Sequence, residues 1–154
     1  MKERRKLKDR RVKERRAVIS GERRRFAERR IKERRAPEIP KTLKEFKTWN
    51  FKGTITVTED FKAFAKLFFK EIKNKLPEGA KLIAQHTCHY FLSGFITKNG
   101  KYVYFSISDV RLWRNEWWTN ILIRRAKNEK DYTGEKNYYT TLDEFTESAE
   151  KLLS

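Results

Sequence analysis

The first 35 residues of this 154-residue chain carry one basic segment twice, and neither copy can supply a hydrophobic core. Residues 3–16 read ERRKLKDRRVKERR and residues 22–35 read ERRRFAERRIKERR, with nine of 14 positions identical. Leu7 and Val12 of the first copy are five residues apart, which separates them by about 140° on a helix. Because no apolar stripe forms, a fold with a core must come from the rest of the chain.

Charge and aromatic residues divide the chain at the same place. Residues 1–35 hold 18 basic and six acidic residues, a net charge of 18 − 6 = +12, and only one of the 21 aromatic residues, Phe26. The other 119 residues hold 20 basic and 15 acidic residues, a net charge of +5. The basic arm cannot bury enough apolar surface to fold alone, whereas 119 residues can support a core.

Pro37 and Pro40 disfavour helix in the residues before them and therefore mark a boundary. Arg, Lys and Glu favour helix within the arm, but two helices of about 14 residues are marginal in water without packing. We expect an arginine-rich helical or disordered arm over residues 1–35, a proline-containing linker over 36–41 and a compact domain over 42–154.

Helix signals frame the compact domain. Thr42 and Glu45 form a capping box that predicts a short helix through Trp49. A second helix begins after Thr58, with apolar residues at the i, i+3, i+4, i+7 and i+11 spacing of one buried face. These apolar residues are Phe61, Phe64, Ala65, Phe68 and Ile72. A capping box from Thr141 to Glu144 predicts a last helix that ends at Leu153.

Strand signals lie between these helices. The alternating segment 51–58, FKGTITVT, is typical of a strand. Asn99-Gly100 predicts a hairpin turn between strands at 81–97 and 101–108, and residues 119–125 read as a further strand. Residues 109–118 are compatible with loop or helix, and 126–137 read as a polar loop. We therefore expect an α+β fold, with an antiparallel sheet of about four strands, helices on one face and an extended arginine-rich helical arm in front.

The arginines of the arm are the main candidate binding residues. Guanidinium groups bind phosphate in a two-pronged geometry and stack on bases, and arginine-rich segments commonly fold on RNA. This chemistry predicts a nucleic-acid partner, with RNA favoured over DNA. An acidic protein surface is the alternative partner, and a solvated helix that only aids solubility is the other interpretation. The candidate residues are Arg4, Arg5, Arg10, Arg11, Arg15, Arg16, Arg23, Arg24, Arg25, Arg29, Arg30, Arg34 and Arg35.

A second cluster combines tryptophan and arginine within residues 111–118. Side chains of these types can stack on unpaired bases or form a protein-binding hot spot. The alternative is that the tryptophans close one end of the core. The candidate secondary contacts are Arg111, Trp113, Arg114 and Trp117.

The segment His86-Thr87-Cys88-His89 contains residue types that bind zinc or act in catalysis. On a strand, His86 and Cys88 face one side and His89 the other, so the three cannot share one ion, and no second His/Cys cluster completes a four-ligand site. No glycine-rich phosphate loop is present. We therefore expect no metal, no cofactor, no catalytic residue and no small-molecule substrate.

The single cysteine, Cys88, excludes an internal disulfide and favours a reducing cytoplasm. The chain has no apolar run of 18 residues that could cross a membrane. Its basic start lacks the apolar stretch of a secretory signal, and the acidic residue before each arginine pair argues against a mitochondrial import sequence.

Residues 119–142, TNILIRRAKNEKDYTGEKNYYTTL, resemble a stretch found in small proteins of bacterial phages and conjugative elements. The layout of a basic arm before a compact α+β domain also resembles anti-CRISPR proteins that inhibit Cas9. Together these resemblances imply a protein of a mobile genetic element, acting in the cytoplasm of a bacterial host, and the missing catalytic motifs lead us to expect that it is not an enzyme. Its implied partner is a nucleoprotein complex such as Cas9 with its guide RNA. The alternative is an inhibitor or adaptor that binds protein alone.

Overall fold

The computed structural model describes residues 37–53, 55–112 and 116–154. The chain divides into two compact units, residues 1–38 and 39–154. The predicted arm lies outside the described residues. Within the second unit, Pro40 is already buried.

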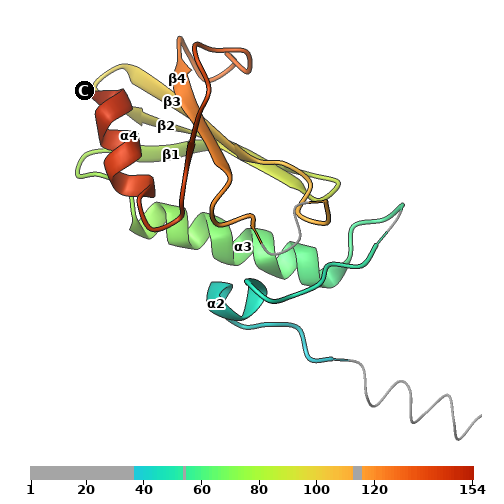
Figure 1. The fold of residues 1–154 in the computed structure, drawn as a ribbon. Coiled ribbons are helices and arrows are strands. Elements are labelled where there is room, and N and C mark those ends of the chain that lie inside the picture. Colours follow the sequence, from blue (N-terminus) through green and yellow to red (C-terminus); the bar gives the residue numbers. More distant parts are fainter. Residues whose placement is uncertain (1–36, 54, 113–115) are drawn as a thin grey trace, which may run out of the picture. The chain divides into compact units, whose positions relative to one another are not determined.

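The described residues form three helices and a five-stranded sheet (Figure 1). The strands follow one another across the sheet in chain order, and every neighbouring pair is antiparallel. This confirms the α+β prediction, with one strand more than expected. The elements are α2 (Leu43–Phe46), α3 (Glu59–Asn74), β1 (Lys81–Cys88), β2 (Phe91–Lys98), β3 (Lys101–Ile107), β4 (Ile121–Ala126), β5 (Tyr138–Thr140) and α4 (Phe145–Leu153).

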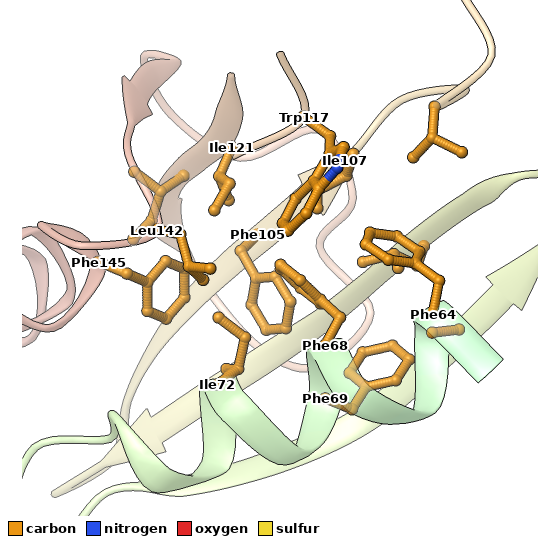
Figure 2. Packing of buried hydrophobic residues seen from close by; sticks show 14 of the residues in the cluster. Phe64, Phe68, Phe69, Ile72, Phe105, Ile107, Trp117, Ile121, Leu142 and Phe145 are labelled. Atoms are coloured by element: carbon orange, nitrogen blue, oxygen red, sulfur yellow. The ribbon is translucent and has the colours of Figure 1, made fainter. Parts of the chain in front are cut away.

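The core lies between the sheet and the helices α3 and α4 (Figure 2). The five apolar residues predicted for one face of α3 are all buried, and Phe69 joins them. Alternate residues of the central strands point toward this helical face, because successive side chains of a strand point to opposite sides. The buried strand residues on that face are Leu92, Ile96, Val103, Phe105, Ile107, Ile121 and Ile123.

Residues 51–58 were predicted as a strand, and the structure shows that this prediction is wrong. The described part of this segment forms no ladder with the sheet; Phe51 enters the core, whereas Ile55 is 87% exposed. A side chain takes the place of a neighbouring strand. The Tyr90 hydroxyl donates to the Thr56 carbonyl at 3.1 Å and lies 3.2 Å from the Thr58 amide that donates to it. Buried backbone polar groups need partners, and here a tyrosine supplies them.

The predicted single strand at 81–97 is instead two strands, β1 and β2, joined by a tight turn at His89 and Tyr90. Cys88 pairs with Phe91, so the turn contains two residues, with φ of 34° at His89 and 66° at Tyr90. Turns of this kind favour Asn and Gly because both central residues need positive φ. The sequence therefore gives no local signal for this turn.

The remaining predictions agree with the structure in outline. The Asn99-Gly100 hairpin between β2 and β3 is confirmed, with φ of 52° and 76° at the two residues. The last helix begins at Phe145 rather than Thr141, although the Thr141 hydroxyl accepts a hydrogen bond from the Glu144 amide at 3.1 Å. The short strand β5 was not predicted.

No helix among the described residues is long and apolar enough to cross a membrane.

Phe105 provides a test of the core. Its ring is fully buried and lies 5.5 Å from Phe145 between ring centroids. Phe105→Ala leaves a cavity that the neighbouring rings cannot fill, so we expect the free energy of unfolding to fall by about 3–5 kcal/mol. Leu112→Ala is the control, because Leu112 is 76% exposed, and should change stability by less than about 0.5 kcal/mol. Urea unfolding of both variants measures the difference, and equal effects would contradict this account of the core.

Candidate nucleic-acid interface

The thirteen arm arginines named above lie outside the described residues, as do Trp113 and Arg114. Of the secondary contacts, the structure describes Arg111 and Trp117, and it places both in structural roles.

Arg111 is held at one end of the sheet by several contacts at once. Its Nε donates to the two Asp109 carboxylate oxygens at 2.9 and 3.1 Å, and Nη1 donates to the Gly53 carbonyl at 2.6 Å. Nη2 lies 3.3 Å from His89 Nε2, and the guanidinium lies 4.1 Å from the centre of the Tyr90 ring. The Arg111 side chain is only 21% exposed. It joins segment 51–58 to the β1–β2 turn and is not poised for a ligand. We call this set of contacts the Arg111 clamp.

Tyr90, on which the Arg111 guanidinium packs, keeps an unfavourable backbone conformation because its side chain is buried and hydrogen-bonded. A positive φ costs a non-glycine residue about 1–2 kcal/mol. The Tyr90 ring is fully buried and lies 4.9 Å from Phe61, while its hydroxyl bonds the 56–58 backbone. Gly53 is required beside it, because a Cβ there would fall 1.7 Å from the Tyr90 hydroxyl. Burial and hydrogen bonding thus stabilise the strained turn.

Trp117 is a core residue and not the surface contact that its chemistry suggests. Its side chain is 1% exposed, its ring lies 4.8 Å from Phe64, and Nε1 donates to the Phe46 carbonyl at 3.4 Å. Trp118 packs edge-on against Trp117 and is partly buried. The tryptophans of the described residues therefore close the core beside α3, which was the alternative interpretation of the cluster.

The structure reveals a basic surface on α3 that the sequence reasoning missed. Lys62, Lys66, Lys70 and Lys73 are all exposed and follow the spacing i, i+4, i+8 and i+11. This spacing places them within an arc of about 80° and along about 16 Å of the helix axis. Lys62 pairs with Glu59 at 2.6 Å. The other three form no ion pair with the described residues, so this lysine stripe presents largely uncompensated positive charge.

Among the described residues, the sheet face opposite α3 and α4 does not offer an open platform for bases. Phe95 and Tyr104 pack at 5.1 Å on this face, and Tyr132 of the β4–β5 loop covers them at 5.3 and 6.0 Å. Arg124 lies 4.5 Å over the Tyr104 ring and donates to Asn137 Oδ1 at 3.0 Å. Phe95 and Tyr104 are almost fully buried, which leaves them no face on which a base could stack.

The same loop is ordered by one carboxylate. Asp131 accepts hydrogen bonds from the amides of Lys127 at 2.9 Å and Gly134 at 2.7 Å. These backbone donors lower the pKa of Asp131 below its usual value. The loop was predicted as polar, and its turn is built by an aspartate that bonds nearby backbone groups.

His86, Cys88 and His89 do not converge on one point. His86 and Cys88 pair with Ser93 and Phe91 on the sheet face opposite the core, whereas His89 belongs to the turn and faces Arg111. Within the described parts of the chain, no group of three His, Cys, Asp or Glu side chains could hold a metal ion.

Comparison with known proteins gives no relative: no family model, curated protein or solved structure matches this chain. The fold therefore defines the protein as an α+β domain with a five-stranded antiparallel sheet.

The Asp109–Arg111 pair makes stability depend on pH. The Arg111 side chain, which donates hydrogen bonds to Asp109, lowers the Asp109 pKa below its ordinary 3.8. A carboxylate with a lowered pKa stabilises the fold above the unfolded pKa and loses that contribution as the pH falls through the folded pKa. We expect Asp109→Asn to reduce the free energy of unfolding by about 1–3 kcal/mol at pH 7. The difference from wild type should shrink below about pH 3.8.

Urea titrations of both proteins at pH 7 and at pH 3 measure this difference. Glu78→Gln is the control, because Glu78 is exposed between Pro77 and Gly79, and it should have little effect at either pH. A wild-type to Asp109→Asn difference that stays constant between pH 7 and pH 3 would show that the carboxylate charge is not what stabilises the clamp.

Proposed function

We propose that this protein is a non-enzymatic nucleic-acid-binding protein that grips phosphate through its arm and prefers RNA to DNA. The observation that carries the proposal is the placement of arginine: 13 of 17 lie in the duplicated arm, which has a net charge of +12. Arginine rather than lysine is the residue suited to paired contacts with phosphate. A tail that only aided solubility would not need arginine.

The lysine stripe of α3 supports the same proposal. It adds three exposed cations without acidic partners among the described residues, on a helix whose opposite face is anchored in the core. Lysines held on a rigid helix make contacts with phosphate that do not depend on base identity. The folded domain thus contributes affinity of the same nonspecific kind as the arm, and specificity has to come from another part of its surface.

The most specific form of the proposal is an anti-CRISPR protein of a phage or other mobile element that engages Cas9 with its guide RNA in the bacterial cytoplasm. The layout of basic arm and compact α+β domain supports this target. A protein inhibitor or adaptor whose arm lies on an acidic protein surface is the competing function. Digestion with RNase and DNase separates the two, because a partner that stays bound after complete digestion contradicts the nucleic-acid proposal.

Deletion of residues 1–35 tests whether the arm supplies most of the RNA affinity while the domain folds without it. The described domain has its own core, so we expect its melting temperature to change little, while affinity for RNA falls by orders of magnitude because most phosphate contacts are lost. The full chain should inhibit DNA cleavage by a Cas9–guide RNA complex, and the deletion should not. Unaltered RNA affinity after deletion would contradict the role of the arm. Cleavage unaffected by excess full chain would remove Cas9 as the target.

The lysine stripe can be tested separately. We expect Lys66→Gln, Lys70→Gln and Lys73→Gln together to reduce the salt dependence of RNA binding by about two to three units of log affinity per log salt. The matched control replaces Lys81, Lys127 and Lys130, which are exposed elsewhere, and changes the net charge equally. Equal effects of the two triple variants would show that only total charge matters.

A further inference from the structure

A cleft of about 500 Å³ lies beside the sheet edge formed by β4 and β5, against α4. Its volume falls within the range of small-ligand sites in proteins. Ile123 of β4 and Leu152 of α4 contribute apolar lining. Ser148 lines it too, and its hydroxyl lies 2.8 Å from the Thr140 hydroxyl, which ties α4 to β5. The cleft is separate from the lysine stripe and from the Arg111 clamp.

Two tyrosines of β5 line this cleft and remain largely exposed. Tyr138 is 47% exposed and Tyr139 is 66% exposed, although most aromatic residues of the described domain are buried. Lys136 Nζ lies 5.7 Å from the centre of the Tyr138 ring. Exposed aromatic rings beside cations are the surface on which proteins stack unpaired bases.

Arg125 adds an oriented cation to the same cleft. Its Nε donates to the Leu152 carbonyl in the last turn of α4 at 3.1 Å, which holds the guanidinium in place. Its two Nη groups have no hydrogen-bond partner among the described residues and lie on an exposed side chain. Lys151 also lines the cleft, although its Nζ is paired with Glu147 at 2.8 Å. Arg125 is therefore the group best placed to bind a phosphate.

Glu135 brings a carboxylate to the cleft, where stacking and phosphate binding alone would require none. Its side chain is exposed and accepts no hydrogen bond from the described residues. A ribose 2′-hydroxyl can donate to such a carboxylate, and this hydroxyl is what distinguishes RNA from DNA at a single site.

We propose that this cleft binds one unpaired ribonucleotide of the RNA that the arm grips. The base stacks on Tyr138, a phosphate contacts Arg125 and the ribose hydroxyl donates to Glu135. This inference rests on the proposed RNA-binding function and deepens it, because it adds a site for single-stranded RNA to the nonspecific contacts of the arm and of α3.

Fluorescence anisotropy with the full chain tests the stacking. The probes are a 12-nucleotide oligoadenylate and a 12-base-pair RNA duplex, at one salt concentration. We expect Tyr138→Ala to weaken oligoadenylate binding about tenfold, because one stacked base is lost, and to change duplex binding less than twofold. Tyr138→Phe keeps the ring and should retain wild-type affinity. Tyr132→Ala, on the opposite sheet face, should change neither affinity once its melting temperature shows that it is folded.

The sugar contact has its own readout. We expect the wild type to bind oligoadenylate more tightly than oligodeoxyadenylate. In Glu135→Ala, the ratio of these two affinities should fall to about one. The ratio cancels the general gain in affinity from removing a negative charge. Glu129→Ala removes the same charge from the neighbouring loop and should leave the ratio unchanged.

The outcomes separate the inference from the function on which it rests. Tight, salt-dependent binding of both probes that Tyr138→Ala leaves unchanged would overturn the cleft and keep the proposed function. A ribose preference that persists in Glu135→Ala would overturn the sugar contact. Failure of the wild type to bind either probe would overturn the proposed function and the cleft together.

Discussion

The packing of the phenylalanine face of α3 against the sheet is the contact on which the rest of the domain depends. Phe61, Phe64 and Phe68 are fully buried on this face. Phe64 packs against Trp117 and Phe68 against Phe105. Burying such a side chain contributes about 1.5–3 kcal/mol each. Because one face of α3 is fixed in this way, its four lysines are fixed on the opposite face. A core contact thus determines the position of a charged surface.

Around this core, the β1–β2 turn and the β5 edge of the sheet differ in structure. At the β1–β2 turn, the buried Tyr90 and the Arg111 clamp hold the described part of segment 51–58, which forms no strand pairing. At the β5 edge, α4 and the short last strand leave a cleft with exposed tyrosines. Strain in the first region is balanced by burial and hydrogen bonds, so its unusual backbone has a structural explanation. The second region has side chains that the fold does not use, which is why it is the better candidate for binding.

Local patterns predicted the elements whose signal lies within one short stretch of sequence. The spacing of Phe61 to Ile72 predicted α3, and Asn99-Gly100 predicted the hairpin between β2 and β3. The strand prediction for segment 51–58 was wrong. The alternation of this segment is typical of a strand, but its backbone bonds to the side chain of Tyr90, more than 30 residues away. The His89-Tyr90 turn was not predicted because tertiary contacts, and not turn-forming residues, stabilise it.

Among the candidate binding residues, some follow a sequence pattern and others are brought together only by the fold. The arm is a candidate because its arginines repeat in the sequence, and it stays a prediction because it lies outside the described residues. The lysine stripe of α3 is visible as an i, i+4, i+8, i+11 spacing, but only the structure shows that these side chains are exposed and mostly without acidic partners in the described domain. Trp117 has the chemistry of a stacking residue, but its burial in the core excludes it as a surface contact. The β5 cleft joins Arg125, Tyr138 and Leu152, residues that no short pattern connects.

The central claim is that a duplicated arginine arm binds RNA phosphates, and the salt dependence of RNA affinity tests it most directly. Neutralising about eight phosphates of a single strand predicts a slope of log affinity against log salt near −6. Alanine in place of the arginines of either copy should reduce that slope by a similar amount, because the copies are near-identical. A slope near −1 for the full chain, or one that changes with only one copy, would contradict multivalent phosphate binding by the duplicated arm.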